Sequence, residues 1–338
     1  MSELFHVSSA PHVRAKASTR NVMLWVNIAM LPTACFGIYN FGFRALLLIV
    51  ATVLSCVLSE TVFNLIAKKK NTIGDLSAVV TGMILALNMP VTLPIWMAVL
   101  GGVFSIVVVK MLFGGLGQNF MNPALGGRCF LLIAFTSEMS NFVTDTYTAA
   151  TPLAELKATH GIIAPWNNYQ ISDMFFGTTP GTIGETSALC LLIGAAILVL
   201  TRVISLRIPV AYLGSFAVLM FFFGEKNFAI KDLIAGTTPV MDLLLPAGTY
   251  VLAQLLCGGI MFGAFFMATD YATSPITKKG QILFGICCGL LTFLFRTIGG
   301  TPEGVSYAII ISNLFVPLIE KITIPRSSGV VKVKKEGK

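Results

Sequence analysis

The sequence predicts an all-α polytopic membrane protein with about ten transmembrane helices. Three observations predict this fold class: 55% of the 338 residues are hydrophobic, only 11% are charged, and the apolar residues form long runs. Soluble domains carry about 25% charged residues, because a water-facing surface needs polar groups. The composition therefore excludes a soluble enzyme, a secreted disulfide-stabilised domain and a disordered chain.

The first segment, residues 1–21, is polar and basic, and the first apolar run begins at Val22. This run is too long for a cleavable signal peptide. We therefore expect a multi-pass protein of the cell membrane whose N-terminus lies in the cytoplasm. Lysines and arginines recur in short clusters between apolar runs, as the positive-inside rule produces. No basic–aromatic stripe is present, and we expect no nucleic-acid partner.

The chain divides into two membrane repeats, residues 22–136 and 184–322. The residues that interrupt the apolar runs recur in the same order in both repeats. Pro123 and Pro275, for example, are 152 positions apart. Short apolar runs within the repeats predict broken or re-entrant segments. Pseudo-symmetric repeats with broken segments at matching places predict a site near the repeat interface.

Between the repeats lies a polar insert, residues 137–183, in which Lys157 is the only lysine or arginine. Five crossings before it place this insert outside the cytoplasm, and its shortage of positive charge agrees. The last segment, residues 323–338, is basic. We expect this tail to be cytoplasmic and able to contact anionic membrane lipid.

Within the insert, Thr151 precedes Pro152 in a pattern typical of a helix start, with threonine as the N-cap and proline at the first helical position. A helix N-terminus also presents free backbone N–H groups that bind phosphate. A threonine hydroxyl there could hold a phosphate group covalently. From the residues alone, a capping role and a phosphate-carrying role both remain open.

The sequence resembles RnfD, a membrane subunit of the Rnf complex, which is related to the NqrB subunit of the sodium-pumping NADH:quinone oxidoreductase. The resemblance covers nearly the whole chain and rests on four stretches: Ser9–His12, Gly117–Ala124, Thr148–Leu153 and Pro180–Ser187. It implies that Thr151 carries FMN through a phosphoester bond. Asp145 and Thr148 belong to the motif recognised by a separate flavin transferase, and Ala149 stands where glycine is common.

The resemblance further implies an electron-transfer subunit of an ion-translocating ferredoxin:NAD⁺ oxidoreductase, with non-covalent riboflavin as a second cofactor. The other membrane and peripheral Rnf subunits would be its partners and would carry the NADH and ferredoxin chemistry. We expect no complete active site and no metal site in this chain, because it has no CxxC pair and no histidine within an apolar run. The sequence does not distinguish Na⁺ from H⁺ or fix the direction of electron flow.

Charged residues within or beside apolar runs are candidates for ion transport, because charge in a membrane is costly. We expect an ion pathway at Glu60 and Asp270. Pairing inside the protein, or snorkelling of side chains near helix ends, is the competing interpretation. The other charges of this kind are Lys110, Arg128, Glu185 and Arg296.

Two alternatives remain. The triplet Asn122-Pro123-Ala124 resembles half of an aquaporin-type pore motif, with Ser274–Ile276 as a degenerate partner. A channel or small-solute transporter is therefore a second hypothesis, although the partner triplet lacks asparagine and a plain pore needs no long insert. The NqrB subunit of the quinone-reducing complex is the other alternative, and the short N-terminal segment favours the Rnf type.

Overall fold

The computed structural model describes residues 18–69, 71–142, 150–158, 170–224, 240–300 and 303–325. Every regular element within these residues is a helix, which confirms the predicted all-α class. In chain order the elements are α1 (Thr19–Phe41), α2 (Phe43–Ile66), η1 (Ile73–Asp75), α3 (Ser77–Leu87), α4 (Ile95–Phe104), η2 (Ser105–Met111), α5 (Pro123–Ala134), α6 (Thr136–Met139), α7 (Pro152–Ala158), α8 (Ile171–Phe176), α9 (Ala188–Leu200), α10 (Arg207–Phe223), α12 (Val240–Leu256), α13 (Ile260–Phe262), η3 (Gly263–Met267), α14 (Lys278–Ile298) and α15 (Val305–Thr323).

Four helices, α1, α2, α14 and α15, are long and apolar enough to cross a membrane. A fifth such segment is broken: the end of α12 and the α13–η3 helix meet at an angle of 69°. Five shorter apolar helices have 10–17 residues: α3, α4 with η2, α5, α9 and α10. Within the described residues, four or five segments are thus long enough to span a membrane, and the five shorter apolar helices agree with the predicted short or broken segments.

The turns between helices follow from a few local residues. Ser18 caps α1, since its hydroxyl accepts a hydrogen bond from the Asn21 N–H at 3.3 Å. Gly42 has a φ of 74°, a conformation that glycine adopts without strain, and α2 begins at the next residue. This one-residue turn folds α2 back along α1, so the two helices run in opposite directions.

We call the end of the bundle where α1 begins proximal and the end where α1 finishes distal. A cavity at the proximal end is lined by Ser18 and Thr19 of α1 and by Glu320 of α15, so α15 finishes there. At the distal end, the Asn40 amide donates to the Gly177 carbonyl oxygen at 3.3 Å. The stretch that follows α8 is therefore distal.

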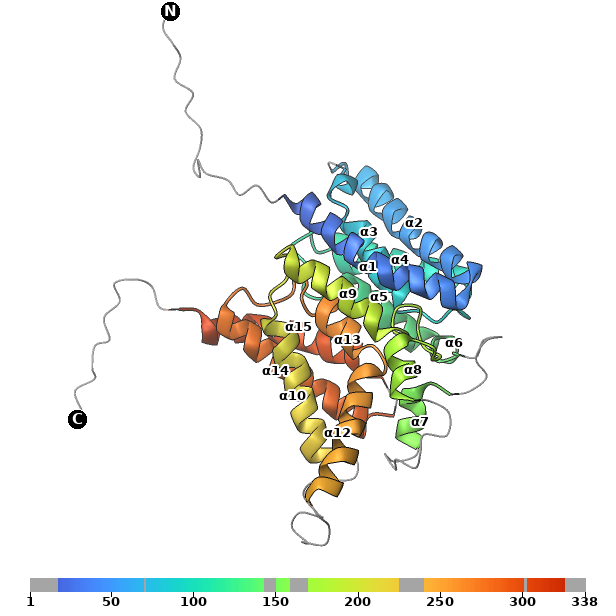
Figure 1. Cartoon of the computed structure of the whole chain (residues 1–338). Helices are drawn as coiled ribbons and strands as arrows, with labels where there is room; N and C mark the ends of the chain where they lie inside the picture. The colour runs from blue at the N-terminus through green and yellow to red at the C-terminus, as the bar shows by residue number, and fades with distance from the viewer. Residues whose placement is uncertain are drawn as a thin grey trace, which may run out of the picture.

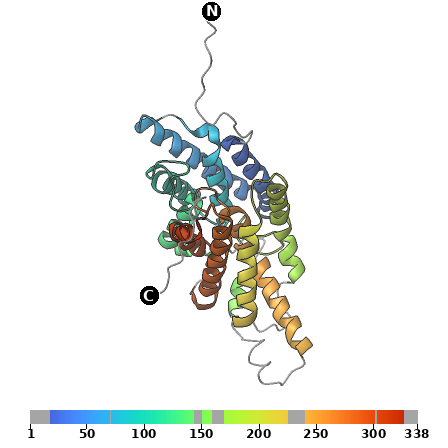
Figure 2. The same ribbon diagram turned by 90° about the vertical axis from the view of Figure 1, so that its left-hand side faces the viewer.

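The two halves of the chain meet along a broad contact (Figures 1 and 2). In both views α1–α4 and the α10–α12–α14 group occupy opposite ends of the molecule, and α9 lies between them. Helix α1 packs along α9, and α5 contacts α15. The Asn122 amide also donates to the Met267 carbonyl oxygen at 3.2 Å, which joins the start of α5 to the end of η3. The interface between the halves is thus a place where helices begin and break.

Candidate functional site

Thr151 immediately precedes α7 and is partly buried. Its hydroxyl oxygen accepts a hydrogen bond from the Ala154 N–H at 3.3 Å, and its carbonyl oxygen accepts from the Glu155 N–H at 3.0 Å. Thr151 therefore caps α7, with Pro152 at the first helical position, as the sequence pattern predicts. The cap uses the oxygen only as an acceptor, so a substituent in place of the hydroxyl proton leaves this bond intact.

Thr151 lines a cavity at the distal end, which we call the distal cavity. Its enclosed volume is about 40 Å³, and its lining residues include Glu185 and Glu303. The remaining wall includes Met174 of α8, the stretch 179–181 that follows α8, and Gly258 in the break between α12 and α13.

Two arginines and two glutamates meet beside the distal cavity, and we call Arg128, Glu185, Arg296 and Glu303 the arginine–glutamate cluster. Arg128 of α5 is 2% exposed. Its Nη1 donates to the Asn88 amide oxygen at 2.5 Å and lies 3.3 Å from Glu185 Oε1, while its Nη2 forms an ion pair with Glu303. One guanidinium of the first half thus holds two carboxyl groups of the second half.

Arg296 of α14 is also buried, at 4% exposure. Its Nη1 donates to the Gln254 carbonyl oxygen at 2.5 Å and side-chain oxygen at 3.1 Å, and its Nη2 donates to the Cys257 carbonyl oxygen at 3.2 Å. The guanidinium also lies 5.1 Å from the centre of the Phe216 ring. Arg296 therefore satisfies carbonyl groups that the break after α12 leaves without helical partners.

Glycines bring the main chain close enough to assemble this cluster. The Gly184 N–H donates to the Leu87 carbonyl oxygen at 2.8 Å, and a Cβ on Gly184 would lie only 2.7 Å from Leu87 Cβ. This contact places Glu185 beside the end of α3. On the other side, the Gly259 N–H donates to Glu303 Oε1 at 3.3 Å.

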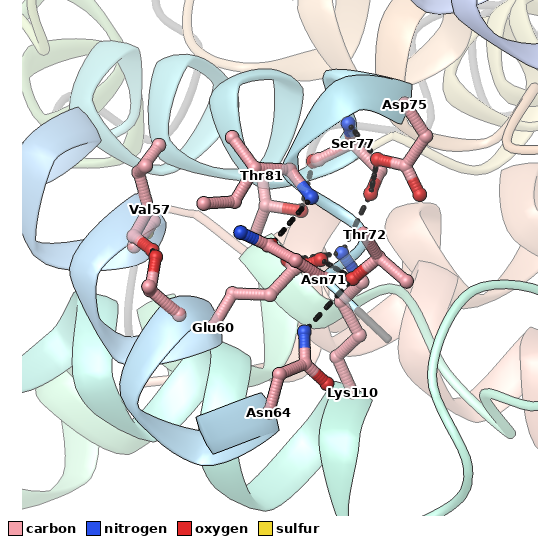
Figure 3. Close-up of polar contacts among 12 residues, drawn as sticks. Val57, Glu60, Asn64, Asn71, Thr72, Asp75, Ser77, Thr81 and Lys110 are labelled. Atoms are coloured by element: carbon pink, nitrogen blue, oxygen red, sulfur yellow. Dashed lines mark hydrogen bonds and ion pairs between the residues drawn. The ribbon is translucent and has the colours of Figure 1, made fainter. Parts of the chain in front are cut away.

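A second buried charge pair, the lysine–glutamate pair of Lys110 and Glu60, is drawn in Figure 3. It lies toward the proximal end, since Lys110 lines a cavity together with Val22 and Met23 near the start of α1. Lys110 Nζ lies 2.6 Å from both Glu60 Oε2 and Ser77 Oγ, and Thr72 Oγ1 donates to Glu60 Oε1. Figure 3 shows these side chains converging from α2, η2 and the start of α3, with Asn64 donating to Thr72. Glu60 is therefore paired inside the protein, as the competing interpretation holds.

Asp270 follows η3 and lines a different space, the proximal cavity, together with Lys110 and Asn119. This cavity has an enclosed volume of about 70 Å³. Asp270 accepts hydrogen bonds only locally, from Thr273 Oγ1 at 3.1 Å and the Ala272 N–H at 3.4 Å. Asn119 is buried, and its side-chain oxygen has no partner within the described part of the chain.

The structure describes only some of the site residues that the sequence predicts. Thr151 lies at a cavity, whereas Asp145 and Thr148 fall outside the described residues. Glu60 and Asp270 do not touch, although Lys110 contacts one and shares a cavity with the other. Sequence reasoning missed Glu303, because it lies in a short polar turn rather than within an apolar run. The signal available in the sequence was a carboxylate next to an apolar run, while two arginines in other apolar runs needed an anionic partner.

The triplet Asn122-Pro123-Ala124 begins α5, and the Asn122 side-chain oxygen accepts from the Ala124 N–H at 3.0 Å. Its supposed partner triplet does not begin a helix, since α14 starts at Lys278 after a Thr277 cap. The described residues therefore lack the second asparagine-capped half-helix of an aquaporin-type pore. Asn122 has a capping role and links the two halves through Met267.

A sequence profile of the NQR2, RnfD, RnfE family matches residues 6–329. The chain belongs to this family. Among its relatives, the D subunit of the Na⁺-translocating ferredoxin:NAD⁺ oxidoreductase complex of Acetobacterium woodii is 46% identical over 100% of both chains. The D subunit of the proton-translocating ferredoxin:NAD⁺ oxidoreductase complex of Clostridium ljungdahlii is 37% identical over 96% of both chains.

A third relative in the NQR2, RnfD, RnfE family is the D subunit of the ion-translocating oxidoreductase complex of Halorhodospira halophila. It is 33% identical to 97% of this chain, over 96% of its own length. Membership confirms the resemblance inferred from the motifs and identifies a multi-pass membrane protein of the oxidoreductase-translocase type. It argues against the aquaporin-like channel.

Proposed function

We propose that this chain is the membrane electron-transfer subunit of an ion-translocating ferredoxin:NAD⁺ oxidoreductase, and that it carries FMN on Thr151. The observation that supports this most directly is the position of the Thr151 oxygen. Thr151 lines a cavity whose wall also includes Glu185 and Glu303 of a largely buried charged cluster. The relatives' names supply the class of complex.

The residues present at Thr151 fit a phosphoester. Esterification replaces the hydroxyl proton and keeps the oxygen that accepts from the Ala154 N–H, so the cap of α7 is compatible with the modification. When bound, flavin supplies the ability to pass electrons singly or in pairs. The chain's own contribution is to tether the cofactor, exclude water around it and set the charge of its surroundings.

The same proposal assigns sides to the bundle. We take the proximal end as cytoplasmic, because basic residues gather there, and the distal end with the insert 137–183 as extracytoplasmic. The flavin transferase that matures the protein, the other Rnf subunits and membrane lipid are its partners. NADH and ferredoxin chemistry belongs to those other subunits.

An ion pathway through Glu60 and Asp270 belongs to this proposal. Support comes from Lys110, which pairs with Glu60 and lines the proximal cavity together with Asp270. Two relatives of high coverage are named for different ions, one for Na⁺ and one for protons. The family alone therefore does not determine the ion that this chain helps to move.

We also assign the second cofactor, a non-covalent riboflavin, to the proximal cavity. Its mainly apolar wall suits a planar ring, and the unpartnered Asn119 oxygen offers an acceptor for a flavin N–H group. Lys110 and Asp270 provide polar groups at its edge. Loss of riboflavin from an Asn119→Leu variant that retains covalent FMN would support this assignment.

The test of the main proposal is the covalent adduct itself. The complex is purified from cells that contain the transferase, and the Thr151 peptide is weighed by mass spectrometry. We expect the added mass of an FMN phosphoester and a fluorescent band in a denaturing gel, both lost in Thr151→Val. Thr136→Val, in α6 at the same end, is the matched control and should keep both signals. An unmodified Thr151 peptide in the parent protein would contradict the proposal.

A further inference from the structure

The arginine–glutamate cluster balances its charges. Its two guanidinium groups and two carboxylates sum to zero when all four are ionised, and Lys157 of α7 lies farther out, donating to the Gly299 carbonyl oxygen. Three of the four side chains are at least nine-tenths buried, namely Arg128, Glu185 and Arg296. Any charge added to the adjoining cavity is therefore weakly screened by water and acts strongly on these groups.

The two carboxyl groups are not equally stabilised as anions. Glu303 forms a direct ion pair with Arg128 Nη2 and accepts the Gly259 N–H at 3.3 Å. Glu185 lies 3.3 Å from Arg128 Nη1, but that nitrogen makes a shorter hydrogen bond of 2.5 Å to Asn88. Less support for the carboxylate form means that Glu185 is the group that accepts a proton first.

We propose that Glu185 takes up one proton when the flavin attached to Thr151 gains one electron, and releases it when that electron leaves. This inference rests on the proposed attachment of FMN to Thr151. The electron comes from the upstream carrier of the complex, and the proton comes from water at the distal mouth of the cavity. One O–H bond of the hydrated proton at the mouth breaks as one O–H bond forms on the Glu185 carboxylate. One positive charge enters with one electron, so the net charge of the cavity and cluster stays at its starting value.

The groups that face Glu185 come from every element around it. Arg128 of α5 donates to the Glu185 carboxylate and so competes with a proton for it. Asn88, at the end of α3, accepts from the same Arg128 nitrogen and so weakens that support. Glu303, from the stretch before α15, opposes ionisation of Glu185, whereas Arg296 of α14 favours it from farther away. An added electron shifts this balance toward the protonated acid, and by reciprocity the proton makes the electron easier to add.

The experiment uses the purified intact complex, and the signal of the Thr151 flavin is isolated by subtracting a Thr151→Val complex. Its midpoint potential is measured against pH. One proton per electron predicts a fall of about 59 mV per pH unit over the range in which Glu185 titrates. We expect this slope to be lost in Glu185→Gln and kept, over a displaced pH range, in Glu185→Asp. Glu138→Gln in α6 is the matched acidic control at the same end and should behave as the parent.

A second readout does not depend on turnover. Reduced-minus-oxidised infrared spectra of the parent complex should show a protonated carboxyl band that appears on reduction and is missing in Glu185→Gln. A parent complex with FMN on Thr151 but without this band would overturn the inference, and so would a slope that Glu185→Gln leaves unchanged. Absence of FMN from Thr151 in the mass spectrum would instead refute the proposed function, so the two failures are distinguishable.

Discussion

At the scale of single residues, the buried charges of this protein are paired with opposite charges or held by carbonyl groups. Lys110 is 2% exposed and Glu60 is 0% exposed, yet each has a charged partner at 2.6 Å. Thr72 and Ser77 add hydrogen bonds to this pair. A buried pair adds little net stability over an apolar substitute, but removing one member leaves the other charge unpaired.

Replacing Lys110 with methionine should therefore destabilise the protein by about 3–5 kcal/mol. The reason is that Glu60 would then be buried without its cation, while methionine fills a similar volume. The measurement is thermal unfolding of the detergent-purified protein. The double variant Glu60→Gln/Lys110→Met serves as control and should recover most of the loss. Equal stability of the single and double variants would show that the pair is not coupled.

The single variant Glu60→Gln distinguishes a structural role of Glu60 from a role in ion transport. If Glu60 also carries ions, Glu60→Gln should lower ion transport in reconstituted complex while electron transfer continues. A purely structural Glu60 would alter stability and leave the ratio of ions moved to electrons transferred unchanged.

At the scale of elements, the break between α12 and α13 shapes the distal cavity. Gly258 lies in this break with a φ of 67°, a backbone conformation that suits glycine. A Cβ there would lie 3.0 Å from Leu153 of α7 and 3.3 Å from Arg296 Nη2. The glycine lets the helix carrying the Thr151 cap approach the membrane bundle closely.

Gly258→Ala should accordingly cost about 1–2 kcal/mol, because alanine is strained at positive φ. The new methyl group should also push α7 away from the bundle, which faster proteolysis of the insert would report. Gly248→Ala is the matched control, since a Cβ at Gly248 meets nothing within 4 Å and alanine favours helix. Equal protease resistance in both variants would argue that α7 does not depend on Gly258.

At the scale of the whole molecule, the two halves are joined by polar contacts as well as by apolar packing. Arg128 of the first half binds Glu185 and Glu303 of the second, and Asn122 binds the Met267 carbonyl group. The distal and proximal cavities lie on either side of this junction. The proximal cavity is lined by residues of both halves, whereas the distal cavity is lined by the insert and the second half.

The proposed orientation predicts which side of the membrane each end faces. A cysteine at Ser137, exposed on α6, should react with a membrane-impermeant maleimide added outside intact cells. A cysteine at Lys279, exposed on the first turn of α14, should react only after the cells are opened. The parent chain, with its seven cysteines, measures background labelling. The reverse pattern would invert the topology.

Much of the fold was predictable because membrane helices are encoded locally. Apolar runs, basic clusters and the Thr151-Pro152 start of α7 depend on near neighbours in the chain, and the structure confirms the helical class and the cap. The sequence also singled out Arg128 and Glu185 as costly charges. It did not show what surrounds them, since their partners lie 40 to 175 positions away along the chain.

By itself, then, the sequence determined that this is an all-helical membrane protein of a recognisable family with a threonine poised at a helix start. The tertiary structure alone decided which charges meet: Glu60 with Lys110, and Arg128 with Glu185 and Glu303. The physical reason is that hydropathy and capping act within a few residues, whereas the pairing of buried charges depends on how helix breaks from both halves come together in space.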